Sequence, residues 1–442
     1  MRRVLVMFLL GLAAASPSSA QDRGQETLPP NDGWASFGAG TAGGAGAAPE
    51  QIYVVRNRRE LIAALNNGVP SSTSPSTPSN APKIIYVEGT IDANVDDQNQ
   101  PLVCEDYYRN GYTLEAFLDF YDPEGPWGRV PPSGALENAR IASRDAQQAR
   151  VRIRPGDNTT IIGVGSNATI RGAWFDVRGS AATPRRNIII RSLTFQDTYD
   201  CFPQWSPTDG ALGSWNALYD SISLRDTTNV WVDHNTFEDR DTADSTLPHH
   251  FGVIYQVHDG LLDITNASDL ITVSWNRFAN HDKTMLIGSG DTAPADVGKL
   301  RVTLHHNLFE NTGQRSPRVR YGQLHIFNNL YAIEDPEAYS YSWGVGIQSQ
   351  IYAQNNYFRT SAAIAPADVI DRLNGTAIYA AGSFVNGKSK AFEVDLVAAY
   401  NAAHTPDLVP TVSWTPTLFV TIHPTQAVEG LVSGSAGPFK DE

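Results

Sequence analysis

The segment "RVTLHHNLF" (301–309) is one of five with a common form, the others being NVWVDHNTF (229–237), LITVSWNRF (270–278), QLHIFNNLY (323–331) and QIYAQNNYF (350–358). Each is a β-rich run that ends in Asn, any residue, then Phe or Tyr. The asparagines lie at 235, 276, 307, 329 and 356, with intervals of 41, 31, 22 and 27 residues. A shortest interval near 22 residues suits one coil of a parallel β-solenoid, and the longer intervals suit coils with inserted loops or two coils.

The chemistry of the repeat supports a solenoid. Asparagine tolerates the left-handed backbone region and forms local hydrogen bonds, which suits a sharp turn between strands. Stacked turns would place one Asn above the next, and the aromatic residue two positions later would point into the stack. A β-sandwich or propeller with coincidental Asn spacing is the alternative. We expect an all-β parallel solenoid with one continuous core, which would make residues 21–442 a single domain.

Two other regions of the chain show helical patterns. In "RNRRELIAALNNG" Asn57 can cap a helix, and Glu60 completes a capping-box pattern ahead of an apolar stripe. We expect this short N-terminal helix to cap the solenoid. Residues 104–150 interrupt the short β-branched runs, because "TLEAFLDFY" and "ALENARIASRDAQQAR" look helical. This segment is predicted to be an excursion of helices and loops from the main body.

The first twenty residues resemble a processing signal. A basic start ("MRR"), an apolar run ("VLVMFLLGLAAA") and small residues ("SPSSA") predict a secretory signal cleaved after Ala20. The apolar run is too short for a membrane anchor. The chain has 33 Lys and Arg against 47 Asp and Glu, a net charge of −14. This charge argues against nucleic acids and anionic membranes as partners. From the signal we expect a secreted protein, exported to the medium or through the periplasm, and we expect it to be a monomer.

The chain contains two cysteines, Cys104 and Cys201. In an exported protein two cysteines can form one disulfide. The sequence does not show that their Cα atoms come close, so the paired and the free alternatives both stay open. Neither cysteine lies in a CxxC or metal-ligand pattern.

Acidic residues gather in three stretches of the chain. Asp259 and Asp263 are four apart, so in extended backbone they share a face, and Asp220 begins a β-run one or two coils earlier. Carboxylates brought together in this way raise one another's pKa unless a cation is present. Oxygen ligands without Cys or His suit Ca²⁺, although solvated surface acid is the simpler alternative.

Basic residues concentrate in "QRSPRVRYG" (314–322). Arg318 and Arg320 are two apart and can share a strand face, whereas Arg315 precedes Pro317 in a turn. Arginine binds carboxylates through a planar fork of donors. Lys283, in "NHDKTMLIGSGD", is a further candidate. The alternative is a network of ion pairs with nearby aspartates.

Taken together, these motifs resemble polysaccharide lyase family 1, the extracellular pectate lyases. "VWVDH" (230–234) is similar to the family's WiDH motif, and "RSPRVR" (315–320) is similar to its RxPxxR motif. "FPQWSPTDG", "HDKTMLIGS" and "TLHHNLFENTGQRSPRVRYGQLHIFNNLY" also look like family segments. The resemblance runs from about residue 33 to the end and is densest over 200–360. It implies a right-handed, single-stranded parallel β-helix.

The resemblance implies a role for each candidate residue. Three aspartates match the calcium ligands, Lys283 matches the lysine that binds the substrate carboxylate, Arg315 matches the proposed base, and Arg320 matches a second substrate-binding arginine; the aspartates are Asp220, Asp259 and Asp263. Arg318 is expected to bind substrate too. Trp343, in "YSYSWGVG", is expected either to line the sugar groove or to pack in the core. Asp233 and His234 of the WiDH motif are expected to be mainly structural.

The implied reaction is calcium-dependent β-elimination on polygalacturonate, giving 4,5-unsaturated oligogalacturonides. Ca²⁺ would neutralise the substrate carboxylate, Lys283 and Arg320 would stabilise the enolate-like charge, and Arg315 would take the C5 proton. Because free arginine stays protonated, this role predicts an alkaline activity optimum. The alternatives are a pectin lyase, a polygalacturonase that hydrolyses with paired carboxylates, or a non-catalytic β-helix that binds glycans.

Overall fold

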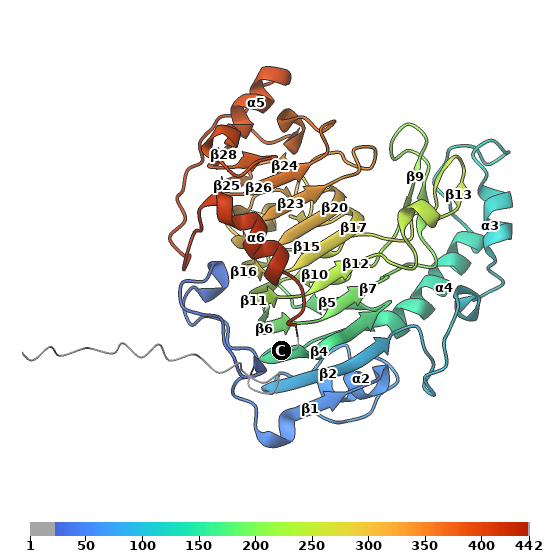
Figure 1. The fold of residues 1–442 in the computed structure, drawn as a ribbon. Coiled ribbons are helices and arrows are strands. Elements are labelled where there is room, and N and C mark those ends of the chain that lie inside the picture. The colour runs from blue at the N-terminus through green and yellow to red at the C-terminus, as the bar shows by residue number, and fades with distance from the viewer. Residues whose placement is uncertain (1–22, 441–442) are drawn as a thin grey trace, which may run out of the picture.

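The computed structural model describes residues 23–440, and the expected signal segment, 1–20, lies outside them. The main body is a right-handed parallel β-helix, as predicted, in which the chain winds upward in coils from β1 (Ile52–Val55) to β29 (Phe384–Val385) (Figure 1). Each complete coil contributes three short strands to three faces. Among residues 23–440 no helix is both long enough and apolar enough to span a bilayer.

The first face is a sheet of parallel strands that carries the candidate site. It consists of β3 (Arg152–Ile153), β5 (Trp174–Arg178), β10 (Ile222–Arg225), β15 (Leu262–Thr265), β18 (Leu286–Ile287), β21 (Arg318–Val319), β24 (Trp343–Gly346) and β27 (Ile370–Leu373). Adjacent strands of this sheet belong to successive coils of the chain. Residues far apart in the sequence therefore become lateral neighbours on this face.

The second and third faces complete the coils. The second face consists of β6 (Arg185–Arg191), β11 (Thr227–Asp233), β16 (Asp269–Ser274), β19 (Val302–His305), β22 (Gln323–Phe327), β25 (Gln350–Gln354) and β28 (Ile378–Ala381). The third consists of β7 (Thr194–Gln196), β12 (Thr236–Glu238), β17 (Arg277–Lys283), β20 (Leu308–Gln314), β23 (Leu330–Ile333), β26 (Tyr357–Thr360) and β29. Below them, the long strands β2 (Lys83–Asp92) and β4 (Thr159–Arg171) run through both faces, and β1 pairs with β2.

The asparagine repeat forms the predicted ladder between these faces. In four successive steps from Asn235 to Asn356, the backbone N–H and the Nδ2 group of one Asn both donate to the Oδ1 of the next, at 2.9–3.1 Å. Every interval, including the longest, is therefore one coil, and the longer intervals contain inserted loops. The left-handed residue is not the ladder Asn but the one before it, for example His306 with φ 56°.

The aromatic residues of the repeat stack inside the coil. Phe237, Phe278, Phe309, Tyr331 and Phe358 lie with ring centroids 4.5–5.1 Å apart and nearly parallel planes. Aliphatic residues stack beside them along the second face, such as Val232 on Val273. The buried core is thus continuous from coil to coil, and each added coil extends it.

Helices cover the ends and one flank of the β-helix. Helix α2 (Arg58–Leu65) places Leu61, Ile62 and Leu65 on the end of the core, as predicted. Asn57 caps it by accepting from the Glu60 N–H at 3.0 Å, whereas the Glu60 carboxylate accepts from Arg56 instead of Asn57. Helix α5 is Leu396–Ala403, and α6 (Thr425–Ser435) packs Val428 and Val432 against the third face.

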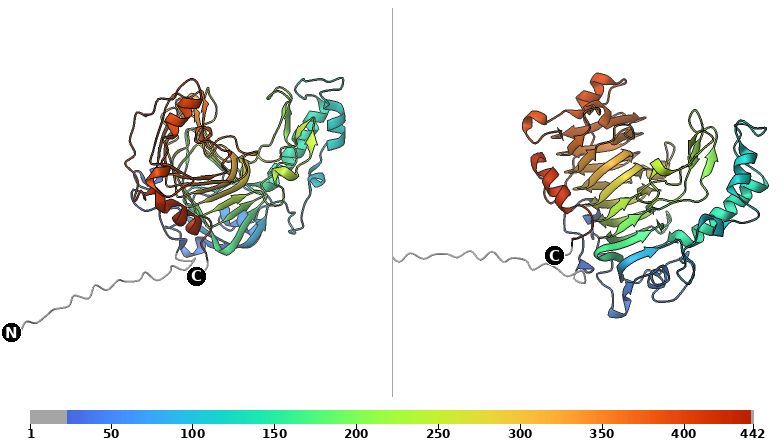
Figure 2. Two further views of the ribbon diagram at one scale, coloured as in Figure 1. Left: turned by 45° about the horizontal axis from the view of Figure 1, so that its top comes forward. Right: turned by 45° about the vertical axis from the view of Figure 1, so that its right-hand side comes forward.

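The predicted excursion is an arm with a core of its own. It contains α3 (Leu114–Tyr121) and α4 (Ala135–Val151), and Figure 2 shows these helices standing away from the coils. The arm also contains two antiparallel hairpins that the sequence did not predict. They are β8–β9 (Gln204–Ser206, Ser214–Asn216) and β13–β14 (His249–His250, Val253–Ile254). Because this arm has a separate hydrophobic cluster, the single-domain assignment of 21–442 stays a prediction.

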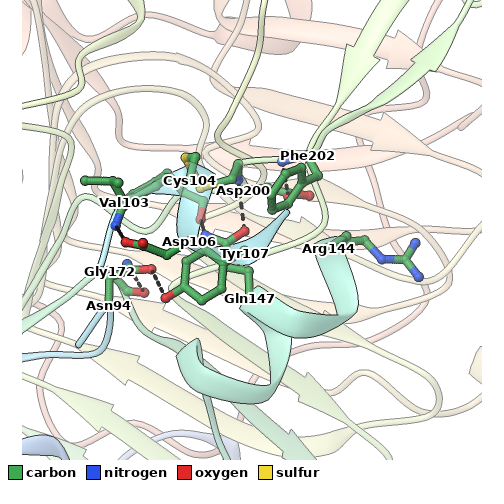
Figure 3. The surroundings of a disulfide bond; sticks show 12 residues. Asn94, Val103, Cys104, Asp106, Tyr107, Arg144, Gln147, Gly172, Asp200 and Phe202 are labelled. Atoms are coloured by element: carbon green, nitrogen blue, oxygen red, sulfur yellow. Dashed lines mark hydrogen bonds between the residues drawn. A yellow bond between two sulfur atoms is a disulfide. The ribbon is translucent and has the colours of Figure 1, made fainter. Parts of the chain in front are cut away.

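A disulfide within the cluster of the arm ties the start of the excursion to the segment after β7, which settles the alternative left open by the sequence. Cys104 and Cys201 are bonded, with Cα atoms 5.5 Å apart (Figure 3). Around the bond, the Cys201 N–H donates to Gln147 of α4 at 2.9 Å, and the Tyr107 hydroxyl donates to Asn94 at 3.1 Å. The bond closes a span of 97 residues that includes both helices of the arm.

Candidate active site

The first face brings the predicted charged residues together. Strands β10, β15, β18 and β21 are consecutive neighbours in this sheet. The candidates lie on these strands or within three residues of their N-terminal or C-terminal ends: Asp220, Asp259, Asp263, Lys283, Arg315, Arg318 and Arg320. The solenoid register therefore explains how residues up to a hundred positions apart can form one site.

Asp220 is buried just before β10. Its Oδ1 accepts the N–H of Gly260 at 3.0 Å, and its Oδ2 accepts the Ser223 hydroxyl. Burial raises the pKa of Asp220 well above its ordinary value, and the charges of Asp263 and Asp259 raise it further. The ionised form of this carboxyl group is thus unstable without a further cation.

Asp263 lies one coil away on β15 and is in a similar position. Its Oδ1 accepts the N–H of Leu286 at 2.9 Å. Burial, followed by the charge of Asp259, raises the pKa of Asp263 to about 7, although Arg315 lies near enough to lower it in part. The predicted effect of clustering on the carboxyl groups is therefore present.

Two of the three predicted carboxyl groups, those of Asp220 and Asp263, converge beside Gly260. A Cβ atom at Gly260 would lie 2.4 Å from the Asp263 Oδ1 and 3.0 Å from the Asp220 Oδ1, so these oxygens converge on a space that only glycine leaves open. The nearest cationic side chains are no closer than 3.8 Å for Arg225 to Asp220 and 3.9 Å for Lys283 to Asp259. Asp259 acts on both groups through its charge, and carboxylate oxygens that lack a close cation are the kind of ligand that Ca²⁺ prefers.

Arg320, directly after β21, is held in a fixed orientation by hydrogen bonds. Its Nε donates to Asp291 at 2.6 Å, and Asn374 donates to the same carboxylate at 2.7 Å. These bonds, that of Asn374 first, lower the pKa of Asp291. Gly288, with φ 103°, allows the close approach, because a Cβ there would lie 2.7 Å from the Arg320 Cβ.

Arg315 and Arg318 have donors that no protein group uses. In the described part of the chain, the buried Nε of each has no hydrogen-bond partner. Arg315 has a left-handed backbone, φ 58°, and its carbonyl accepts the Met285 N–H at 2.7 Å. Burial, then the charges of Arg320 and Arg315, lower the pKa of Arg318. Each of these buried donors needs a partner, such as a water or a ligand.

Lys283 is the last residue of β17 and lies between the aspartates and the arginine cluster. Its Nζ is 3.9 Å from the Asp259 Oδ1, and its register partner on β20 is Gln314, the residue before Arg315. The lysine thus borders both the carboxylates and the arginine cluster. The alternative of a simple ion-pair network accounts for Arg320 with Asp291, but within residues 23–440 neither Arg315 nor Arg318 has a carboxylate within 4 Å.

Trp343 does not line a groove. It is fully buried on β24, where its Nε1 donates to the Tyr331 hydroxyl at 2.8 Å and its ring packs edge-on against Phe358. Its assignment to substrate binding is therefore wrong, because no face of the indole reaches solvent. The packing alternative holds.

The sequence did not reveal a buried network behind the calcium candidates. Asp239 contacts His281 at 2.6 Å and His258 at 3.5 Å, and the other His281 nitrogen contacts the carbonyl of Asp259 at 2.8 Å. Burial lowers the pKa of His281, but Asp239 outweighs it and the pKa rises to about 9. Three residues spread over forty positions gave no sequence signal, because only the coil register brings them together.

Asp239, His258 and Asp244 also place one potential ligand atom each within 4.8 Å of one another. However, the two ring nitrogens of His258 lie 2.7 Å from the carbonyl oxygens of Thr198 and Thr242. A nitrogen that donates to a carbonyl has no lone pair for a metal. This cluster is therefore a hydrogen-bonded support for the site and does not fit a metal centre.

The WiDH residues lie on the second face. Asp233 accepts from Arg191 at 2.8 Å and from Ser274 at 2.7 Å. Burial raises the pKa of Asp233, but His234 and Arg191 outweigh it and bring the pKa to about 2. Phe439 near the C-terminus packs on His234 with centroids 4.3 Å apart. These contacts link coils and termini, which agrees with a structural role.

Comparison with known proteins places the chain among enzymes with this fold. A family model described as pectate lyase matches residues 133–421. A pectate lyase of Bacillus subtilis (strain 168) is 41% identical over the full length of both chains. A solved thermostable pectate lyase is 46% identical with a TM-score of 0.89, covering 95% of this chain and 99% of that one.

A second solved structure, a pectate lyase bound to a hexasaccharide, is 41% identical with a TM-score of 0.85. It covers 94% of this chain and 99% of its own. Identity at this level over nearly the whole of both chains extends well beyond a shared fold. The chain therefore belongs to the pectate lyases of polysaccharide lyase family 1.

Proposed function

We propose that this pectate lyase cleaves polygalacturonate by calcium-dependent β-elimination to 4,5-unsaturated oligogalacturonides, with Arg315 as the base. Cleavage of pectate follows from the family, whereas the metal, the residue roles and the products are our proposal. The observation that carries it is the pairing of charge-deficient carboxyl groups on one side with arginines whose donors are unused on the other. A substrate carboxylate bound between the two sets would accept hydrogen bonds from the arginines and would share the metal that the carboxyl groups would hold.

Asp220, Asp259 and Asp263 would hold the metal. Bound there, Ca²⁺ supplies a Lewis acid that neutralises the galacturonate carboxylate and makes the neighbouring C5 proton more acidic. The network of Asp239 and His281 fixes the Asp259 backbone and so positions this ligand. The three aspartates favour the charged polymer over the methyl-esterified substrate of a pectin lyase.

Lys283 and Arg320 orient the sugar carboxylate. Asp291 and the Gly288 carbonyl hold the Arg320 guanidinium, so it is preorganised to donate to the oxygens on which negative charge develops. Lys283 supplies a compact charge beside the carboxylates. Arg318, also partly exposed on this face, binds the carboxylate of an adjacent sugar of the polysaccharide.

Arg315 takes the C5 proton as the C5–H bond breaks. The electron pair forms the C4=C5 double bond, the C4–O bond breaks, and the departing oxygen takes a proton from solvent. A base needs a free lone pair, and the arginine side chain carries one only as the deprotonated guanidine, which high pH favours. We therefore expect an alkaline activity optimum.

The deciding experiment follows ultraviolet absorbance during incubation with polygalacturonate, with Ca²⁺ and again with EGTA. A rise only with Ca²⁺ supports metal-assisted elimination, because the unsaturated product absorbs. Release of reducing sugar without absorbance would mean hydrolysis by a polygalacturonase-like route, and neither signal would favour a glycan-binding role. Secretion and a monomeric state, which we also propose, are checked by detecting the protein in culture medium and by light scattering.

A further inference from the structure

A second basic region lies away from the candidate site, at the beginning of the β-helix. A cavity of about 700 Å³ opens there between the loop 76–80, the ends of β3 and β5, and the loop 179–184. Four arginines line it: Arg154, Arg178, Arg185 and Arg186. In a chain of net charge −14, such a concentration needs an explanation.

Local carboxylates do not balance these arginines. Asp157 lies 3.2 Å from Arg185 and 3.9 Å from Arg186, and Asp176 lies 3.2 Å from Arg178. Asp176 is also 3.7 Å from Arg154, so two carboxylates serve all four guanidinium groups. The side chains of Arg186 and Arg178 are 72% and 46% exposed, which leaves most of their donors free for a ligand.

The surroundings add more positive than negative charge. Asp226 is the next carboxyl group, and Arg178 opposes the burial that raises the pKa of Asp226. Arg152, whose pKa is lowered by burial and then by Arg154, adds a further cation. Arg225 pairs in register with Arg178 on the neighbouring strand. With the four lining arginines, six arginines thus lie in or beside the cavity, against Asp157, Asp176, Asp226 and the Asp220 that Arg225 approaches.

The same strands connect the cavity to the candidate site. Asp176, Ser223 and Asp263 occupy one register row across β5, β10 and β15. Arg178 and Arg225 are paired two positions further along β5 and β10, on the same side of the sheet. Arg225 reaches to 3.8 Å from Asp220. Since parallel strands lie about 4.8 Å apart, β5 at the edge of the cavity is about 10 Å from the Asp263 strand.

The opposite end of the first face has a different character. A smaller cavity of about 360 Å³ there is lined by Asp368, Asp371 and Tyr400, among others. Asp371 continues the register row of Arg318 through Gly344. Acidic groups repel a polyanion, so the arginine end is the favourable direction for an extended charged chain.

We infer that the arginine cavity is a distal binding site for galacturonate carboxylates, which holds the polymer chain beyond the sugars at the scission point. This inference rests on the proposed function. Arginine suits the task because its planar fork binds a carboxylate through two parallel hydrogen bonds. Exposed arginine–carboxylate contacts are individually weak, so two of them together change affinity by about tenfold.

The test is the double variant Arg178→Gln/Arg186→Gln, compared with Arg56→Gln/Arg359→Gln. The control also removes two exposed arginines, from outside the cavity, and so matches the change in net charge. With polygalacturonate at saturating Ca²⁺, we expect the cavity variant to raise KM about tenfold with kcat within twofold of wild type. Its KM should also rise less steeply with added salt than that of wild type, because fewer ionic contacts remain. Arg186→Gln alone is the milder variant, should the double one lose its far-ultraviolet circular dichroism.

Three results would overturn the inference. One is an unchanged KM in the cavity variant, and another is a rise of equal size in the control, which would implicate net charge alone. The third is a fall in kcat without a change in KM, which would indicate a role in folding the first coils. These outcomes are separate from failure of the proposed function, because that failure would show in wild type, as absence of calcium-dependent absorbance.

Discussion

Substituting Gly260 by alanine tests whether the convergence of carboxyl groups is functional. The new Cβ would lie 2.4 Å from the Asp263 Oδ1, about 1 Å short of the 3.4 Å at which ordinary van der Waals contact begins. Asp263 has little freedom to retreat, because its Oδ1 also accepts the Leu286 N–H at 2.9 Å. A misplacement of about 1 Å at a reacting centre costs on the order of 100-fold in rate, so we expect kcat/KM to fall by about that factor.

The assay is ultraviolet absorbance on polygalacturonate over a series of Ca²⁺ concentrations. The half-activating Ca²⁺ concentration should rise in Gly260→Ala, and high Ca²⁺ should restore part of the activity. Gly290→Ala is the control, because a Cβ at Gly290 would have open space around it. If Gly260→Ala shows the same Ca²⁺ activation curve as Gly290→Ala, the assignment of a metal to these carboxyl groups is refuted.

Three further predictions concern the base, the ladder and the buried acid of the second face. Arg315→Lys should lower kcat by about 100-fold or more with an unchanged Ca²⁺ activation curve; retention of most activity would exclude the base role. Asn307→Ala should lower the free energy of unfolding in urea by about 2–4 kcal/mol, because the Asn276 N–H and the Val273 carbonyl lose their partners, and a loss below about 0.5 kcal/mol would argue against the ladder. The pKa of Asp233 is about 2 against an ordinary 3.8, so its contribution of about 2 kcal/mol is present above about pH 4 and lost as the pH falls towards 2. Urea unfolding of Asp233→Asn should accordingly vary less with pH over this window than that of wild type, and equal slopes would contradict the assignment.

The fold was predictable because the residue types of its Asn-x-aromatic repeat each have a clear structural role. Side-chain amides that bond to the next coil need Asn, and rings that stack at about 5 Å need Phe or Tyr, so both recur at each turn. The left-handed backbone position was misplaced by one residue. That position is filled by residues as different as His306, Trp275 and Asn328, so composition gave no signal for it.

The site was predictable only in part. The charged residues that would touch substrate occur in dense motifs, whereas their supports are dispersed: Asp291 and Asn374 hold Arg320, and Asp239 reaches His281 across a coil. Trp343 was misassigned because an aromatic residue near a glycan site is indistinguishable in sequence from one in the core. The hairpins of the arm were missed because their strands are only two or three residues long.

The ladder of asparagines has a consequence for how such a molecule can change in length. Each ladder Asn bonds to the Asn of the adjacent coils and to nearby backbone carbonyls, and the intervals between these Asn residues vary from 22 to 41 residues without altering the Asn–Asn bonds. A whole turn could therefore be duplicated or deleted, for instance by joining residue 328 to Asn356, with the broken rung reformed by its new neighbour. Growth by such modules would lengthen or shorten the saccharide-binding face while leaving the reacting centre intact.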